Sequence, residues 1–203
     1  QIFTNQEIVN DMANDFIDNY LKQAPKDMTE VFGLYKQVST DTVVHAEMQK
    51  VYDHYINMMP GAPAIDFEMT DVNGKKYRLS DFKGKAVYID VWATWCCSCL
   101  KKIPLFLQLA DKYRYRNDVA FITISIDRSK VRPKWLKALQ EHGMTGLLNL
   151  IPDMDHVSPF EEAYHCSSVP RYIIIDGKGN IVTAFAPSPG DGLEVLVESI
   201  LNQ

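Results

Sequence analysis

The sequence predicts an α/β domain with a central mixed sheet flanked by helices, preceded by a helical N-terminal segment. Beyond residue 60, strand patterns alternate with amphipathic helical patterns, in the order β-α-β-α-extension-β-β-α after a first hairpin. This order is typical of a sheet with parallel strands first and an antiparallel pair last. Before residue 60, apolar residues recur at helical spacing. The turn-rich link Pro-Gly-Ala-Pro at 60–63 separates the two, so we expect a helical segment at 1–60 and the sheet domain at 61–203.

Three helices are expected in the N-terminal segment. Thr4 and Glu7 have the spacing of a capping box at the start of the first helix. The apolar stripes indicate core packing rather than a cofactor pocket. The residues expected to face the core are Val9, Ala13, Phe16, Ile17, Tyr20 and Leu21, then Val31, Leu34, Tyr35 and Val38, then Val44, Met48, Val51, Tyr52, Tyr55, Ile56 and Met59.

The elements of the sheet domain follow from apolar patterns and turn signals. The turn Asp-Val-Asn-Gly at 71–74 predicts a hairpin of 65–69 with 75–79. The continuous apolar run 85–91 predicts a buried central strand. The later elements are expected at 100–116 (helix), 119–126 (strand), 134–142 (helix), 147–151 (extended), 160–164 (helical turn), 171–176 and 180–185 (hairpin) and 192–201 (helix).

The stretch 92–99, Trp-Ala-Thr-Trp-Cys-Cys-Ser-Cys, runs from the central strand into a helical pattern. Cys96 is therefore expected at a helix N-terminus, where unpaired backbone N–H groups and the helix dipole favour a thiolate. Cys99 lies one turn into the helix on the same side, close enough to form a small disulfide ring. We expect Cys96 to be activated and exposed and Cys99 to be shielded, so that the pair exchanges disulfides with another protein.

Two other interpretations of this cysteine pair are weaker. A structural zinc site needs a second Cys/His pair, and the only candidates, His165 and Cys166, are adjacent residues that point to opposite faces of an extended chain. A purely structural disulfide here would stabilise the fold little, because closing a four-residue ring removes little entropy from the unfolded chain.

Composition excludes some classes of partner and a membrane-spanning segment in this sequence. The chain of 203 residues has a net charge of -5, which argues against a nucleic-acid partner. It contains no apolar run of the roughly 20 residues that span a bilayer. Because it begins with Gln1, we expect a processed or trimmed chain from which any signal peptide or membrane anchor has been removed.

Several motifs carry a resemblance to a known family. Trp-Cys-x-x-Cys after the first core strand and Val-Pro before the terminal hairpin resemble the thioredoxin fold. The stretches at 61–67, 79–85, 92–96 and 176–179 resemble the TlpA/ResA-like group of bacterial extracytoplasmic thiol–disulfide oxidoreductases, related to the peroxiredoxin-type branch. The resemblance covers residues 61–203, and the first 60 residues carry no comparable motif.

The resemblance implies roles for individual residues. Cys96 is the attacking thiolate and Cys99 the resolving thiol. Pro170 is cis and lies against the cysteine pair, with Val169 offering backbone groups to an extended partner peptide. The implied partners are protein thiols and disulfides and a membrane-bound electron donor of the disulfide-reductase type, in the cell envelope or periplasm. No metal and no cofactor beyond the Cys96–Cys99 disulfide is implied.

Asp90 has two interpretations. It is either an ordinary acid at a strand edge or, by resemblance to thioredoxins, a buried aspartate that exchanges a proton with the resolving thiol. Burial would raise its pKa. The lysine that often accompanies such an aspartate in the next strand is replaced by Thr123.

The centre of the motif departs from the common Gly-Pro. Cys97 and Ser98 stand there, Ser98 adds a hydroxyl that can donate to a thiolate, and Trp95 precedes the nucleophile; all three are expected to modulate the redox centre. The motif contains no His of the kind found in strongly oxidising members, and Lys101 and Lys102 help a thiolate only modestly at exposed positions. We therefore expect a reducing to intermediate potential.

The other cysteine thiols are weighed separately. Cys97 is expected to be a bystander rather than an alternative attacking thiol, because a ring with Cys99 would be very tight. Cys166 is expected to be a buried small hydrophobe or a spectator thiol rather than a redox or metal group.

Thiol–disulfide exchange as an envelope reductant is the leading function, with haem-site cysteines of cytochrome c or other envelope disulfides as typical family substrates. One alternative is a Cu(I)-binding or metallochaperone module using the thiols of Cys96, Cys97, Cys99 and Cys166, although Leu100 stands where copper-delivery relatives have a second cysteine. The other is a thiol peroxidase, for which Thr94 is present but the upstream proline is not.

Overall fold

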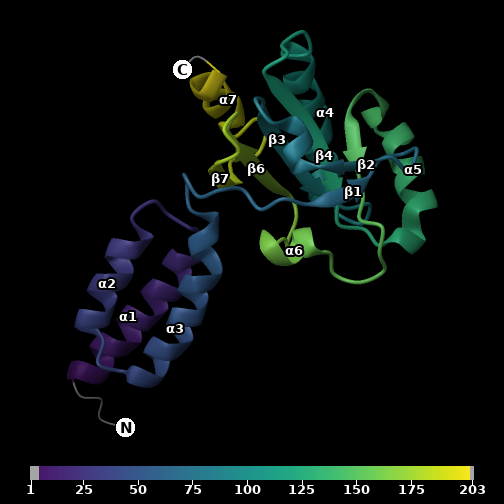
Figure 1. Ribbon diagram of the computed structural model, residues 1–203. Helices are drawn as coiled ribbons and strands as arrows, with labels where there is room; N and C mark the ends of the chain where they lie inside the picture. The colour runs from purple at the N-terminus through teal and green to yellow at the C-terminus, as the bar shows by residue number, and fades with distance from the viewer. Residues whose placement is uncertain (1–4, 202–203) are drawn as a thin grey trace. The chain divides into compact units, whose positions relative to one another are not determined.

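The computed structural model describes residues 5–201, and the chain divides into two compact units between Ala62 and Pro63 (Figure 1). The expected Thr4 cap lies outside the described residues. No helix within 5–201 is long and apolar enough to cross a lipid bilayer.

The N-terminal unit consists of three helices side by side, α1 (Asn5–Leu21), α2 (Met28–Val38) and α3 (Thr42–Tyr55), with the 3-10 turn η1 (Ile56–Met58) at its end (Figure 1). Asp41 caps α3, since its Oδ1 accepts the backbone N–H groups of Val43 and Val44, both at 3.1 Å. The buried core of the unit is Ile17, Leu21, Met28, Phe32 and Tyr35.

The core-facing sides predicted for α1 and α2 are partly wrong. Phe16, Leu34 and Val38 are all more than half exposed. The predicted residues Ile17, Leu21 and Tyr35 do lie in the buried core, and a hydrogen bond of 2.7 Å from the Tyr35 hydroxyl to the Asn14 Oδ1 also joins α1 to α2. Helical spacing alone does not show which of two neighbouring faces of a helix is buried.

The C-terminal unit contains a five-stranded sheet in the order β5-β4-β3-β6-β7. Strands β3, β4 and β5 run parallel, and β6 pairs antiparallel with both β3 and β7. The elements, in chain order, are β1 (Glu68–Thr70), β2 (Lys76–Arg78), η2 (Leu79–Phe82), β3 (Ala86–Trp92), α4 (Cys97–Lys112), β4 (Val119–Ser125), η3 (Ser129–Val131), α5 (Arg132–Glu141), η4 (Met144–Gly146), β5 (Leu148–Leu150), α6 (Pro159–Ala163), β6 (Arg171–Ile175), β7 (Ile181–Ala186) and α7 (Leu193–Leu201).

Strand β3 is the centre of the sheet, and all seven of its residues are buried, as its continuous apolar character predicts. On one face, Tyr88 belongs to a cluster with Phe106 of α4 and with Leu193 and Val197 of α7. This face therefore packs α4 tightly and holds the residues at its N-terminus in a fixed position relative to β3.

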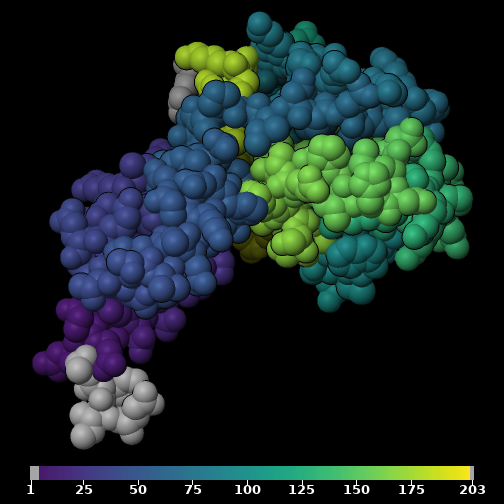
Figure 2. Space-filling model, turned by 60° about the horizontal axis from the view of Figure 1, so that its bottom comes forward, coloured from purple at the N-terminus to yellow at the C-terminus, as the bar shows by residue number. Residues whose placement is uncertain are grey.

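The accessory hairpin β1–β2 forms its own two-stranded sheet, as expected. It is joined to the chain just after β5 by one bridge, in which Thr70 and Ile151 exchange backbone hydrogen bonds of 3.1 and 3.0 Å. The segment that enters the hairpin also lies against α6, because the Tyr164 hydroxyl donates to the Ile65 carbonyl at 2.8 Å. Figure 2 shows the segment that enters the hairpin (blue) and the region of α6 (light green) side by side on the surface of the unit.

Candidate active site

Cys96 and Cys99 form a disulfide at the junction of β3 and α4, with their Cα atoms 5.3 Å apart. Cys96 is the N-cap of α4, and its Sγ accepts the backbone N–H of Cys99 at 3.1 Å. The expected placement of the first cysteine at a helix N-terminus is therefore observed. An N–H group that points at this sulfur would also stabilise a negative charge on it.

Cys96 is not exposed, contrary to expectation. Only 5% of its surface is accessible, and Cys99 is buried as expected, whereas Cys97 is exposed. Two neighbours cover the Cys96 sulfur in the disulfide form: the Ser98 hydroxyl at 3.3 Å and the Val169 carbonyl at 3.6 Å. A reacting group therefore has a narrow approach to this sulfur.

The segment before β6 reaches the cysteines from far along the chain. The Val169–Pro170 peptide bond is cis, as the resemblance implies. The pairing of β6 with β3 brings this peptide bond close to the cysteines, because Arg171, the first residue of β6, pairs with Val91 near the end of β3. The indole of Trp95, which directly precedes Cys96, is 59% exposed and offers an apolar contact close to the cysteine pair.

Asp90 is buried in β3 rather than placed at a strand edge. It pairs in register with Thr123 of β4 and Tyr172 of β6, and its Oδ1 has no hydrogen-bond partner. Burial raises the pKa of Asp90 to about 7. Thr123, at the position of the missing lysine, donates its hydroxyl to the Asn149 Oδ1 at 2.8 Å instead. The carboxyl group can therefore hold or release a proton near neutral pH.

Lys101 and Lys102, the two positive charges expected beside the cysteines, differ in their surroundings. Lys101 is exposed on α4. The Lys102 ammonium group donates to the Asp191 carboxylate at 2.7 Å and to the Pro189 carbonyl at 3.2 Å, so its charge is neutralised near α7. Neither lysine has a hydrogen bond to a cysteine sulfur among the described residues.

Cys166 is buried, and its S–H donates to the Tyr164 carbonyl at 3.7 Å. Burial raises the pKa of its thiol to about 12, so it is a protonated, unreactive group at neutral pH. Within residues 5–201, no group of three or more His, Cys, Asp or Glu side chains is placed to hold a metal ion.

Two carboxylates near the site were not singled out from the sequence. Asp127, just after β4, binds Thr94 in the turn that leads to Cys96. Glu161 of α6 is 7% exposed and accepts the Arg128 guanidinium at 2.9 and 2.7 Å. The sequence offers a signal for Glu161 only, since Ser158 and Glu161 have capping-box spacing, and the box is present.

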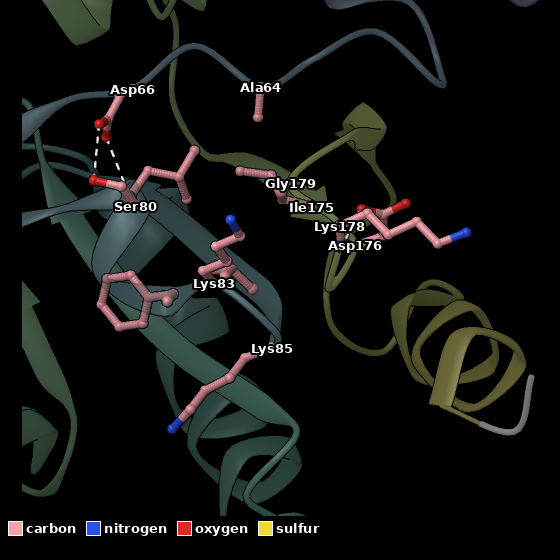
Figure 3. A pocket seen from close by; sticks show the side chains of 12 residues that line it. Ala64, Asp66, Ser80, Lys83, Lys85, Ile175, Asp176, Lys178 and Gly179 are labelled. Atoms are coloured by element: carbon pink, nitrogen blue, oxygen red, sulfur yellow. Dashed lines mark hydrogen bonds between the residues drawn. The ribbon is translucent and has the colours of Figure 1, made fainter.

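A pocket of about 180 Å³ lies at the other end of β3 from the cysteines (Figure 3). Its carboxylates already serve local turns: Asp66 accepts the Ser80 hydroxyl at 3.0 Å, and Asp176 accepts two backbone N–H groups of its own loop. The lining residues are Ala64, Asp66, Leu79, Ser80, Phe82, Lys83, Lys85, Val87, Ile175, Asp176, Lys178 and Gly179. This pocket brings together three of the four stretches that carry the family resemblance, and it is remote from the cysteine chemistry.

Comparison with known proteins gives consistent matches. The family described as Redoxin matches residues 59–199. The thiol-disulfide oxidoreductase ResA of Geobacillus kaustophilus is 30% identical over 121 residues, which are 60% of this chain and 66% of that protein. ResA of Bacillus subtilis is 29% identical over 124 residues, 60% of this chain and 64% of that protein. The chain thus spans slightly less than two thirds of the length of these curated relatives.

Solved structures agree with these matches. A putative thiol-disulfide oxidoreductase from Bacteroides vulgatus superposes with a TM-score of 0.64 at 39% identity, covering 71% of this chain and 99% of that one. A thiol:disulfide interchange protein from Bacteroides sp. gives a TM-score of 0.63 at 28% identity, covering 73% and 93%.

Proposed function

The chain belongs to the Redoxin family, among the TlpA/ResA-like thiol–disulfide oxidoreductases of thioredoxin fold, and we propose that it reduces disulfides of protein partners in the cell envelope. The observation that carries this proposal is the Cys96–Cys99 disulfide at the N-terminus of α4, beside the Val169–Pro170 segment. The curated relatives and the solved structures named above are thiol–disulfide oxidoreductases or interchange proteins by name, which supports the reaction class.

In the first step, the reduced protein presents Cys96 as a thiolate. The Cys99 N–H and the Ser98 hydroxyl, which lie within 3.3 Å of this sulfur, stabilise its charge. The thiolate attacks one sulfur of a partner disulfide, a Cys96–partner bond forms, and the other partner sulfur leaves as a thiolate. Val169 and Pro170 line the groove that holds the partner chain during this step.

In the second step, Cys99 resolves the mixed disulfide. Its thiol gives a proton to the Asp90 carboxylate, whose pKa of about 7 suits it to receive one, and the new thiolate attacks the Cys96 sulfur. The Cys96–Cys99 bond forms, the bond to the partner breaks, and the second partner sulfur leaves. The partner gains two electrons and the chain returns to the disulfide form.

A membrane-bound donor of the disulfide-reductase type then supplies two electrons to reopen the Cys96–Cys99 bond. The similarity to the ResA relatives supports the proposed envelope location, and partner disulfides persist in such an oxidising compartment. Haem-site cysteines of cytochrome c and other envelope disulfides are the substrates we propose.

The test is reduction of insulin disulfides by the full chain with dithiothreitol as electron donor. We expect Cys96→Ser to abolish turnover. We expect Cys99→Ser, reduced and then freed of dithiothreitol before insulin is added, to accumulate a mixed disulfide with insulin that is visible on non-reducing gels. Cys166→Ala, which removes a buried thiol outside this chemistry, is the matched control and retains turnover. Full activity in Cys96→Ser would refute the proposal.

The two alternatives gain no specific support. No group of three or more His, Cys, Asp or Glu side chains that could hold a metal ion is found among residues 5–201. The threonine that a peroxidase would use, Thr94, is committed to the Asp127 carboxylate. We therefore keep disulfide reduction as the single proposed function.

A further inference from the structure

The carboxylate of Asp127 anchors the turn that carries Cys96 by two hydrogen bonds. The Cys96 N–H donates to the Ala93 carbonyl at 3.0 Å, which closes the turn. Within it, Thr94 donates its backbone N–H to the Asp127 Oδ2 at 2.8 Å and its hydroxyl to the Asp127 Oδ1 at 3.0 Å. Both oxygens of Asp127 are therefore directed at the residue two positions before the attacking cysteine.

Asp127 is an unusual group for this location, because it is only 3% exposed. Besides Thr94, it accepts the Ser125 hydroxyl at 2.7 Å, so its three donors are all uncharged. A buried carboxylate without a cation is costly unless its oxygens are fully bonded. Two of the three donors are hydroxyl groups, which can also accept, so an asparagine can form hydrogen bonds here as well. Its hydrogen bonds to Thr94 would be neutral, however, and weaker than those to a carboxylate.

The position of this carboxylate is itself fixed by the sheet. Asp127 follows β4, which pairs with β3 along its whole length, and Trp92 is in register with Ser125. The Ile126 N–H also donates to the Trp92 carbonyl at 2.9 Å. The contact between Thr94 and Asp127 therefore continues the pairing of β3 with β4 into the loop before α4.

We propose that Asp127 is a positioning residue for the redox centre, which favours the Cys96 thiolate by holding the Thr94 turn so that Cys96 stays the N-cap of α4. The contact that stabilises the thiolate is the Cys99 N–H, 3.1 Å from the Cys96 sulfur. If the turn lost its contact with Asp127, the Cys96 sulfur could move away from the N–H groups at the start of α4. The thiolate would then lose stabilisation, because the helix dipole acts only within the first turn. The proposal rests on the proposed function in taking Cys96 as the attacking thiolate.

The test measures the thiolate directly in the reduced full chain. The rate of iodoacetamide alkylation at Cys96 is followed from pH 5 to pH 10 in the wild type and in Thr94→Ala, Thr94→Ser and Asp127→Asn. Fragmentation of the peptide by tandem mass spectrometry distinguishes Cys96 from the adjacent thiol of Cys97. We expect the midpoint to rise by about one pH unit in Thr94→Ala, which is a roughly tenfold smaller thiolate fraction below the midpoint. Thr94→Ser restores the hydroxyl and is expected to titrate as the wild type. Asp127→Asn is expected to shift in the same direction as Thr94→Ala.

The chain contains a matched control. Asp155 accepts the Ser129 hydroxyl and the Lys130 N–H, both at 2.8 Å, the same pair of donor types in an exposed turn. Ser129→Ala is expected to leave the Cys96 midpoint unchanged. Circular dichroism melts establish that each variant is folded, and if Asp127→Asn does not fold, the two Thr94 variants decide the question.

Three results would overturn the proposal: a wild-type midpoint in Thr94→Ala, an equal shift in Ser129→Ala, or a shift in Thr94→Ser as large as in Thr94→Ala. A lower midpoint in Asp127→Asn would also overturn it, because the carboxylate would then act by its charge rather than by position. Failure of the proposed function looks different: Cys96 of the wild type would titrate near the ordinary thiol value of about 8.5.

Discussion

Replacing Asp90 by asparagine should stabilise the oxidised protein in a pH-dependent way. The carboxyl group has an ordinary pKa of 3.8, and burial in β3 raises it to about 7. Below pH 4, the group is protonated in both the folded and the unfolded chain, and its ionisation costs nothing. As the pH rises toward 7, the unfolded chain releases the proton while the folded chain retains it, so the wild type loses stability relative to the variant.

The size of this effect follows from the two pKa values. Each pKa unit corresponds to about 1.4 kcal/mol, so ionising Asp90 in the folded domain costs about 4 kcal/mol once the pH is above 7. We expect the stability difference between Asp90→Asn and the wild type to grow by this amount between pH 4 and pH 8. Urea unfolding of the disulfide form at a series of pH values measures it, because Cys96 and Cys99 do not titrate in that form.

Asp118 provides the comparison. Its carboxylate is exposed, and the Arg116 guanidinium beside it lowers its pKa to about 2. Asp118→Asn should therefore give no gain in stability at high pH. If Asp90→Asn gained no stability over the wild type between pH 4 and pH 8, the carboxyl group would be solvated, and its role as a proton acceptor near neutrality would be refuted.

Three further predictions concern the thiols, the redox couple and one buried ion pair. Without reductant, Ellman titration should detect one thiol per native chain, Cys97, and two after denaturation, when Cys166 is exposed; two in the native state would contradict the burial of Cys166. Equilibration with glutathione buffers should place the Cys96–Cys99 couple well below the strongly oxidising limit of roughly −120 mV, and a value near that limit would contradict the expected reducing to intermediate potential. Glu161→Gln should lower the free energy of unfolding by about 3 kcal/mol in urea, because the partly buried Arg128 guanidinium loses its opposite charge and keeps only neutral acceptors such as the Ile126 carbonyl. A loss no larger than that of an exposed ion pair would show that solvent compensates.

The sheet and the redox centre were largely predictable because their signals are local. An uninterrupted apolar run identifies β3, and the spacing of Cys96 and Cys99 after it defines both the helix start and the disulfide. The register of Asp90 with Thr123 also agrees with the expected replacement of a lysine.

Other features depend on packing that the sequence does not encode locally. Asp127 is 33 residues from Thr94, and only the parallel pairing of β3 with β4 brings them together. Cys96 is covered by the carbonyl of Val169, which lies 73 residues away. The core faces of the first two helices were only partly predicted, since helical spacing places Phe16 beside Ile17 but does not show which of the two is buried.

The bridge between Thr70 and Ile151 has a consequence for bound partner chains. A partner chain bonded covalently to Cys96 stays beside this domain for the lifetime of the mixed disulfide. During this time, the unpaired backbone groups of an edge strand could pair with it as an additional strand. One border of the sheet is β5, a strand of only three residues, and just beyond it the β1–β2 hairpin occupies the backbone of Ile151. At this border a bound partner chain therefore finds few free backbone groups with which to pair.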